Sequence, residues 1–208
     1  MRLITKLFNY VLATTTKHKI DESHGLLHSM EVLRYSNKIF ESEVIKRPFI
    51  QPHERIIYVS AILHDMCDKK YMNEKEGIQE IEHYLQDSLT QKEIDVTSKI
   101  ISTMSYSTVK KNGFPLLYEY QTAYHIVRES DLLTAYNFDR SMIYHMHKNS
   151  SSNLYEVFLE SKNLFNNRIF MHEKDNLFIT DFSKLESKSL HEKSIEQIKQ
   201  WESIVSKY

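Results

Sequence analysis

The sequence predicts an all-α, single-domain helical bundle. Only 3 glycines and 3 prolines occur among 208 residues, so few residues interrupt regular structure. Apolar residues recur at three- and four-residue steps through most of the chain, which is the period of an amphipathic helix. Strong apolar–polar alternation, the pattern of a half-buried strand, is absent. A chain of this length is most simply one domain, residues 1–208, with a sizeable core.

The first residues favour an ordinary helix packed on the domain. Residues 1–19 carry no acidic side chain, and their apolar residues fall at helical spacing in two sets: Leu3, Leu7 and Val11, and Ile4, Phe8 and Leu12. The lack of acids would also suit an amphipathic transit peptide. Polar residues interrupt the apolar run, which argues against a secretory or membrane-spanning segment.

Seven further segments are predicted to be helical, with ends defined to within about two to four residues. They are residues 24–41, 53–67, 74–87, 91–104, 117–137, 153–166 and 184–206. A dimer seam is the alternative to simple packing for the last of them.

Local signals predict where several elements begin and end. Thr90 and Glu93 have the spacing of a capping box, so a helix should start at Thr90. "KKNGFP", residues 110–115, favours turn geometry. "KNSSSN", residues 148–153, reads as a polar loop. The weak periodicity of residues 170–181 indicates an irregular loop or a short hairpin.

Composition excludes several classes of partner and site. With 27 basic and 28 acidic residues, the net charge of −1 gives no electrostatic case for nucleic acid or an anionic membrane as the main partner. Cys67 is the single cysteine, which rules out an internal disulfide and a Cys-rich zinc site. A reducing, cytoplasmic location is consistent with this cysteine content.

Polar residues interrupt a helix that should be buried on every side. In "VSAILHDMCDKKY", residues 59–71, an apolar run ends at His64 and Asp65. An unpaired buried charge is strongly unfavourable, so Asp65 needs a partner. Asp68 would share the same side if the helix continued, since it lies four residues after His64.

Two other predicted helices carry similar interruptions. His24 and His28 lie four residues apart, on one face of a helix for which Asp21 or Ser23 is the expected N-cap. An apolar stripe continues from His28, which points this imidazole toward the interior. In the later helix 117–137, Asp131 is the one charge on an otherwise apolar stripe.

One divalent cation would satisfy all three interruptions. Neutral imidazoles and ionised carboxylates suit Mn, Fe, Co, Ni or Zn, and two Asp oxygens also admit Mg. The alternative is that His28 bonds a backbone carbonyl while the aspartates pair with Arg34 or Arg128. For the four residues taken jointly, a metal site is the simpler explanation: His28, His64, Asp65 and Asp131.

The order His, His-Asp, Asp resembles the HD-domain superfamily of metal-dependent phosphohydrolases, in its small single-domain members. "DESHGLLHSMEVL", "AILHDMCDKKY" and "IVRESDLLTAY" are similar to its successive motifs, and "IISTMSYSTVKKNGFP" is similar to a Ser-rich segment before the last one. The resemblance covers about residues 20 to 140, leaving a helical extension over about residues 150 to 208. It implies a helical bundle of HD-domain type.

The resemblance also implies roles for individual residues. His28, His64, Asp65 and Asp131 match the metal ligands. His24 and Asp68 match residues with catalytic roles, His24 toward phosphate and Asp68 in proton transfer. Lys70 matches a residue with a phosphate role. Further candidate phosphate contacts lie in the segment after the Thr90 helix: Ser105, Tyr106, Ser107 and Lys110 or Lys111. For Ser107 and Lys111, solvated loop positions are an equal alternative.

Two positions depart from the family pattern. Glu31 stands where many small relatives have Arg, and Glu129-Ser130 replaces the more usual Asp-Ala. Neither position is a ligand, so the departures bear on substrate preference.

The predicted activity is hydrolysis of a phosphate ester or anhydride, most simply of a nucleotide, by metal-activated water. The expected partner is thus a small phosphate substrate, and a homodimer is left open. The main alternative is a catalytically idle HD-fold module that binds nucleotides or proteins. A redox oxygenase with a second iron and a purely structural bundle are further alternatives.

Overall fold

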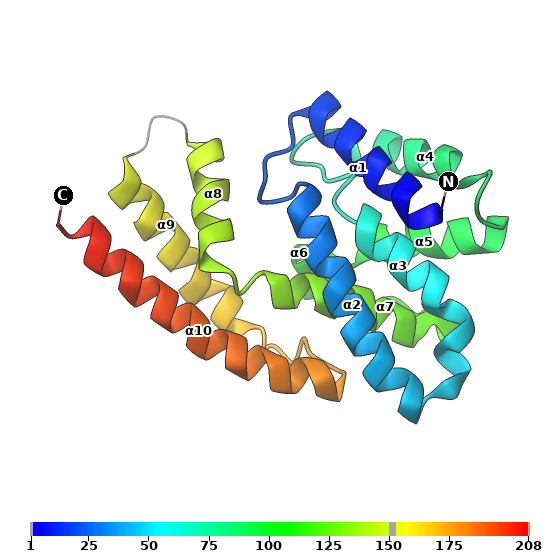
Figure 1. The fold of residues 1–208 in the computed structure, drawn as a ribbon. Helices are drawn as coiled ribbons and strands as arrows, with labels where there is room; N and C mark the ends of the chain where they lie inside the picture. Colours follow the sequence, from blue (N-terminus) through cyan, green and yellow to red (C-terminus); the bar gives the residue numbers. More distant parts are fainter. Residues whose placement is uncertain (1, 150–152, 208) are drawn as a thin grey trace.

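The computed structural model describes residues 2–149 and 153–207, and these residues form α-helices and short 3₁₀ turns with no strand among them (Figure 1). The predicted all-α class is confirmed. None of the helices in the described residues is long and apolar enough to cross a membrane.

The helices follow one another in this order: α1 (Leu3–His18), α2 (Leu26–Lys46), α3 (Glu54–Leu63), α4 (Glu74–Leu85), α5 (Gln91–Thr103), α6 (Tyr106–Asn112), α7 (Gln121–Thr134), α8 (Phe138–Lys148), α9 (Leu154–Asn167) and α10 (Asp181–Val205). The described residues also form three 3₁₀ turns, which lie before α3, before α7 and after α9: η1 (Pro48–His53), η2 (Tyr118–Tyr120) and η3 (Ile169–Met171).

Each predicted helix is present, and two helices were not predicted. α6 was taken as part of a loop, because it is only seven residues long; the Ser105 side chain caps it by accepting from Thr108 N. α8 was missed because its buried face mixes Phe138 and Met142 with Ser141 and His145, which hides the apolar period.

Several end signals behave as the sequence predicts. The Thr90–Glu93 capping box is formed in full. Gly113, with φ of 74°, ends α6 in a backbone conformation that favours glycine. Residues 170–181 form an irregular segment rather than a hairpin, running through η3 and turns to Thr180, the N-cap of α10. In the predicted loop 148–153, residues 150–152 lie outside the described residues.

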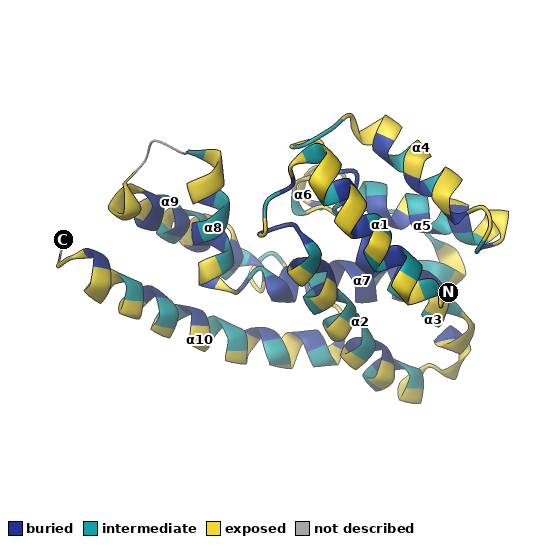
Figure 2. Cartoon of the chain, turned by 45° about the horizontal axis from the view of Figure 1, so that its top comes forward, coloured by how far each residue is buried: buried dark blue, intermediate teal, exposed yellow. Residues whose placement is uncertain are grey.

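α7 is the central element, packed against α2, α3 and α10 (Figure 1). Its buried residues surround the whole helix, and it appears almost entirely dark in Figure 2. Fully burying side chains such as Ile126, Val127 and Leu133 contributes about 1.5 to 3 kcal/mol each. This packing fixes the end of α7, where Asp131 lies.

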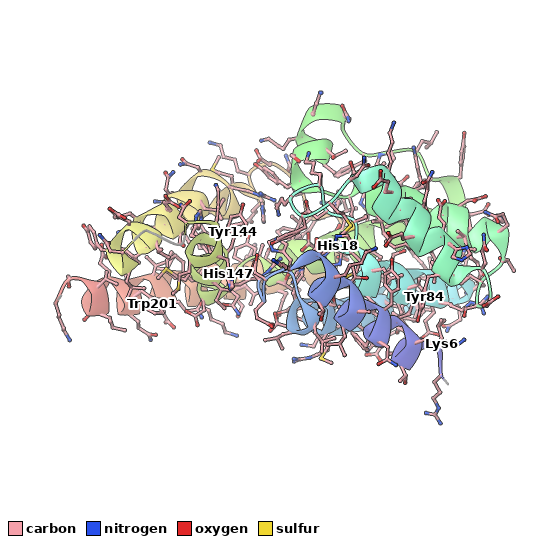
Figure 3. All side chains as sticks on the ribbon, turned by 90° about the horizontal axis from the view of Figure 1, so that it is seen from above. Lys6, His18, Tyr84, Tyr144, His147 and Trp201 are labelled. Atoms are coloured by element: carbon pink, nitrogen blue, oxygen red, sulfur yellow. The ribbon has the colours of Figure 1, made fainter. Side chains whose placement is uncertain are left out.

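Two groups of helices flank this centre. α1, α4 and α5 enclose one apolar cluster with α3, including Leu7, Leu63 and Ile81. The Tyr84 hydroxyl donates to the carbonyl of Lys6 at 2.7 Å, which joins α4 to α1 (Figure 3). On the other side, α8, α9 and α10 pack on one another, and α10 continues beneath α7 (Figure 1).

Candidate metal centre

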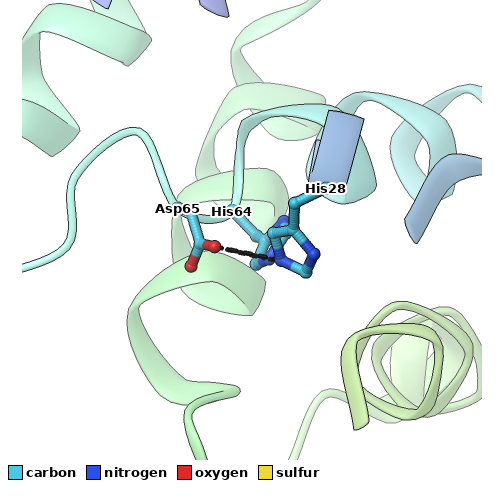
Figure 4. A group of neighbouring side chains, drawn as sticks. All are labelled: His28, His64 and Asp65. Carbon is cyan, nitrogen blue, oxygen red and sulfur yellow. Dashed lines mark hydrogen bonds and ion pairs between the residues drawn. The ribbon is translucent and has the colours of Figure 1, made fainter. Parts of the chain in front are cut away.

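Four donor atoms from three elements converge beside the start of α8. His28 lies in the first turn of α2, His64 and Asp65 directly follow α3, and Asp131 is in the last turn of α7. His28 Nε2 is 3.0 Å from His64 Nε2 and 3.1 Å from Asp65 Oδ2 (Figure 4). Asp131 Oδ1 is 3.4 Å from His28 Nε2 and 3.6 Å from His64 Nε2.

Hydrogen bonds on the far side of each ring orient both imidazoles. His64 Nδ1 lies 2.9 Å from the carbonyl of Ala61, so this nitrogen donates. The Thr134 hydroxyl donates to the carbonyl of Asp131, and its oxygen lies 3.4 Å from His28 Nδ1, from which it can accept. Both Nε2 atoms consequently face the shared space, the arrangement that metal-binding histidines need.

These donors suit a metal ion. Nitrogen and oxygen ligands about 2.1 Å from one ion lie about 3.0 to 3.4 Å from each other, close to the distances observed. His28, His64 and Asp65 each offer a donor atom within 4.8 Å of the others. Asp65 Oδ2 is buried and accepts no hydrogen bond. The group of His28, His64 and Asp65 could therefore hold a metal ion. Asp131 is not part of this group of three, but its Oδ1 lies near both imidazoles.

Electrostatics show that the centre attracts positive charge. Burial opposes ionisation of Asp65 and Asp131, but the neighbouring imidazoles hold both carboxyl pKa values well below their usual range. Burial alone would lower the pKa of His64, yet Asp65 and Asp131 raise it to about 10. Two ionised carboxylates thus share the centre with two imidazoles, and a cation there would offset their charge.

A guanidinium that the sequence analysis did not identify also reaches the centre. Arg140, in the first turn of α8, places Nη2 3.0 Å from His28 Nε2 and Nη1 3.2 Å from Thr134 Oγ1. Its Nε donates to the carbonyl of Ser23. Within the described residues, the arginines considered as alternative partners form no ion pair with the two aspartates. Arg34 is exposed, and Arg128 donates to Glu129 and to the carbonyl of Leu177 while interacting electrostatically with Asp131.

His24 lies beside the centre, although not on a helix as predicted. α2 begins after Gly25, which is its N-cap, so neither Asp21 nor Ser23 has that role. Instead, Asp21 accepts from the backbone and hydroxyl of Ser23. This turn sets the His24 ring 6.1 Å from the His28 ring, measured between centroids.

Lys70 and Asp68 adjoin His24. Lys70 Nζ lies 3.0 Å from His24 Nε2 and 3.1 Å from Asp68 Oδ2. Burial, with Lys70 and Arg140 nearby, lowers the pKa of His24 to about 3. Its neutral ring accepts from Lys70, so the ring is suited to orienting that ammonium group. Asp68 reaches this position from a turn, because α3 ends at Leu63 and the helix does not continue through Asp68.

Ser107 and Lys111 are exposed on α6. Ser107 Oγ lies 3.3 Å from Ser105 Oγ. Among the described residues, no polar contact joins Ser107 or Lys111 to the four converging side chains.

Further residues missed by the sequence analysis complete the surroundings. Arg140, Tyr144 and Lys148 recur at four-residue steps along α8, a signal that could have been found had the helix been predicted. The Tyr144 ring, labelled in Figure 3, lies 5.7 Å from the His24 ring and 5.5 Å from Lys70 Nζ. Arg168 stacks 4.4 Å from the Tyr106 ring and interacts electrostatically with Asp131 and Arg140. Arg168 gave no sequence signal, whereas Tyr106 lies in the segment after the Thr90 helix that was considered for phosphate contacts.

The fold and the centre together define an all-α protein with a buried His/Asp group of possible metal ligands. No family model and no curated protein matches the sequence. A crystal structure of a protein from Lactobacillus plantarum, a Northeast Structural Genomics target, is similar in fold, with a TM-score of 0.72 and 19% sequence identity. The similarity covers 99% of this chain and 97% of the other, so it extends over the whole fold.

Proposed function

We propose that this protein is a metal-dependent phosphohydrolase of the HD-domain superfamily, acting on a phosphate ester or anhydride of a nucleotide. The observation that carries the proposal is the convergence of His28 Nε2, His64 Nε2, Asp65 Oδ2 and Asp131 Oδ1, with both imidazoles oriented from behind. The order of these residues in the chain also resembles that superfamily.

The charge around the centre supports a phosphate substrate. Arg140 lies directly at the centre, and Lys70 lies beside His24. Arg168, which directly precedes η3, interacts electrostatically with Asp131. Guanidinium and ammonium groups bind phosphate oxygens well, whereas a redox centre for a neutral substrate would not need them.

The residues around the centre have separate roles in the proposed reaction. His28, His64, Asp65 and Asp131 would hold a divalent cation, which would supply a Lewis acid for a phosphoryl oxygen and a source of nucleophilic water near neutral pH. Arg140 and Lys70 bind and orient phosphoryl oxygens. The His24 ring holds Lys70 in place, and Asp68, 3.1 Å from Lys70 Nζ, is the candidate to take up or deliver a proton.

An assay of the purified protein tests this function. Nucleoside mono-, di- and triphosphates are offered with Mn, Co, Ni, Fe, Mg or Zn, and released phosphate or pyrophosphate is measured. We expect turnover with at least one metal that His64→Ala and Asp65→Asn both abolish. His83→Ala removes an exposed imidazole on α4 and is the matched control. If no metal supports turnover that depends on His64 and Asp65, the proposed enzymatic activity is refuted.

The second candidate is a catalytically idle module that binds nucleotides through the same basic residues. It predicts nucleotide binding in equilibrium dialysis without product release. A redox oxygenase would require a second iron, so a metal content of one ion per chain excludes it.

A further inference from the structure

Arg140 is held by three acceptors from different parts of the chain. Its Nε donates to the carbonyl of Ser23 before α2, its Nη1 lies 3.2 Å from Thr134 Oγ1 at the end of α7, and its Nη2 lies 3.0 Å from His28 Nε2. The guanidinium is charged at any ordinary pH. The carboxylates of the centre attract cations, and one fixed positive charge, that of Arg140, already lies there.

His28 cannot serve Arg140 and a metal ion at once. Its Nδ1 faces the Thr134 hydroxyl, which uses its own proton on the carbonyl of Asp131, so the ring proton is on Nδ1. Nε2 then has a single lone pair. This lone pair, which also lies 3.0 Å from His64 Nε2, cannot both accept from Arg140 Nη2 and bind a metal ion. The positive charges of the guanidinium and the metal ion also repel each other.

Released from His28, the guanidinium remains at the edge of the centre. Its Nε and Nη1 acceptors belong to Ser23 and Thr134, which are not among the four converging ligands. Before this release, Nη2 lies 3.0 Å from His28 Nε2, so a phosphoryl oxygen bound in the same centre would be within its reach. A guanidinium fork suits a phosphoryl group, which two parallel N–H groups can bind together.

We propose that Arg140 occupies the cation site of the metal-free protein and, when a metal ion takes His28, turns to the phosphoryl group of the substrate, so that metal and anion bind cooperatively. This inference rests on the metal site of the proposed function, but it concerns binding and not turnover. Because coupling between two sites is reciprocal, it is measurable from the metal side alone.

The test is Mn²⁺ binding, followed by the electron paramagnetic resonance signal of the free ion, with and without inorganic phosphate. In the wild type, phosphate should tighten Mn²⁺ binding by about fivefold or more. Arg140→Gln should bind Mn²⁺ about threefold to tenfold more tightly than the wild type without phosphate, because a competing positive charge is removed. It should also lose the effect of phosphate.

Two further variants make the test specific. Arg34→Gln removes one positive charge from an exposed position on α2 and should behave as the wild type does. Arg140→Lys keeps the charge but lacks the guanidinium fork, so the effect of phosphate should weaken without disappearing. Circular dichroism checks that each variant is folded, and the wild-type comparison needs no variant.

The possible failures are distinguishable. An unchanged effect of phosphate in Arg140→Gln, or no effect of phosphate in the wild type, overturns the role of Arg140 while the metal site stands. If the wild type binds no Mn²⁺, or if His64→Ala does not weaken the binding, the proposed metal site fails and this inference fails with it.

Discussion

Glu129 should be a structural anchor whose loss destabilises the whole fold. Its carboxylate, 0% exposed, lies 3.2 Å from Arg128 Nη2, and it accepts from Ile179 N at 2.8 Å. It also accepts from the backbone and hydroxyl of Thr180, at 3.1 and 2.7 Å. These bonds fasten the segment before α10 to α7, two residues from Asp131.

Glu129→Ala would remove all these acceptors and leave the 1% exposed Arg128 as an unpaired buried charge. Breaking a buried pair in this way costs about 3 to 5 kcal/mol. In a chain of this size, each kcal/mol lowers the melting temperature by about 2 to 4 °C, so a decrease of about 6 to 20 °C is expected. Glu129→Gln, which keeps one acceptor oxygen, should lose about 1 to 3 kcal/mol.

Urea denaturation followed by circular dichroism measures these losses. The control is Glu119→Ala, because Glu119 pairs with Lys92 at 2.8 Å and both side chains are exposed, so little stability should be lost. Glu129→Gln should still bind metal, whereas Asp131→Asn should bind it more weakly. A loss for Glu129→Ala as small as that of Glu119→Ala would refute the structural role.

Three other perturbations test separate parts of the structure. Burial lowers the pKa of His172 to about 3, below its ordinary value of 6.5, so the unfolded chain binds an extra proton between these pH values and stability falls as pH falls. His172→Phe should therefore reduce the slope of unfolding free energy against pH by about 1.4 kcal/mol per pH unit in titrated urea melts, and an unchanged slope contradicts this. Gly77→Ala should destabilise by about 1 to 3 kcal/mol in thermal melts, since the new Cβ would lie 2.8 Å from Cys67 Cβ. Gln79→Ala, at an exposed position of the same helix, should be near neutral, and equal effects would show that the contact at Gly77 relaxes freely. A metal ion at about one hundred times its dissociation constant should stabilise the wild type by about 2.7 kcal/mol in calorimetry and leave His64→Ala unchanged, and an equal gain in both would place the ion elsewhere.

Much of the candidate centre was predictable because each ligand breaks a local pattern. His64 and Asp65 end an apolar run, and Asp131 is the one charge on an apolar stripe of α7. A buried charge on such a stripe needs a partner wherever the helix packs, so the requirement is visible before the partner is. His28 Nε2 does lie within 3.1 Å of Asp65 Oδ2.

The environment of the centre was less predictable. Asp21 and Ser23 have the composition of an N-cap, but they form a turn and α2 starts at Leu26. Ser107 and Lys111 were candidates for their place in a loop after the Thr90 helix, but they lie exposed on α6. Phosphate binding by these two residues stays a prediction, as do the nucleotide substrate and the cytoplasmic location.

The sequence by itself determined the all-α class, most of the helices and the His and Asp residues that could hold a metal ion, because helical period and the cost of an unpaired charge act over a few neighbouring residues. Only the tertiary structure decided that Arg140 contacts His28 and that Glu129 accepts a hydrogen bond from Thr180. These partners are 112 and 51 residues apart in the chain. Their contacts depend on how α8 and α10 pack around α7, which no local pattern specifies.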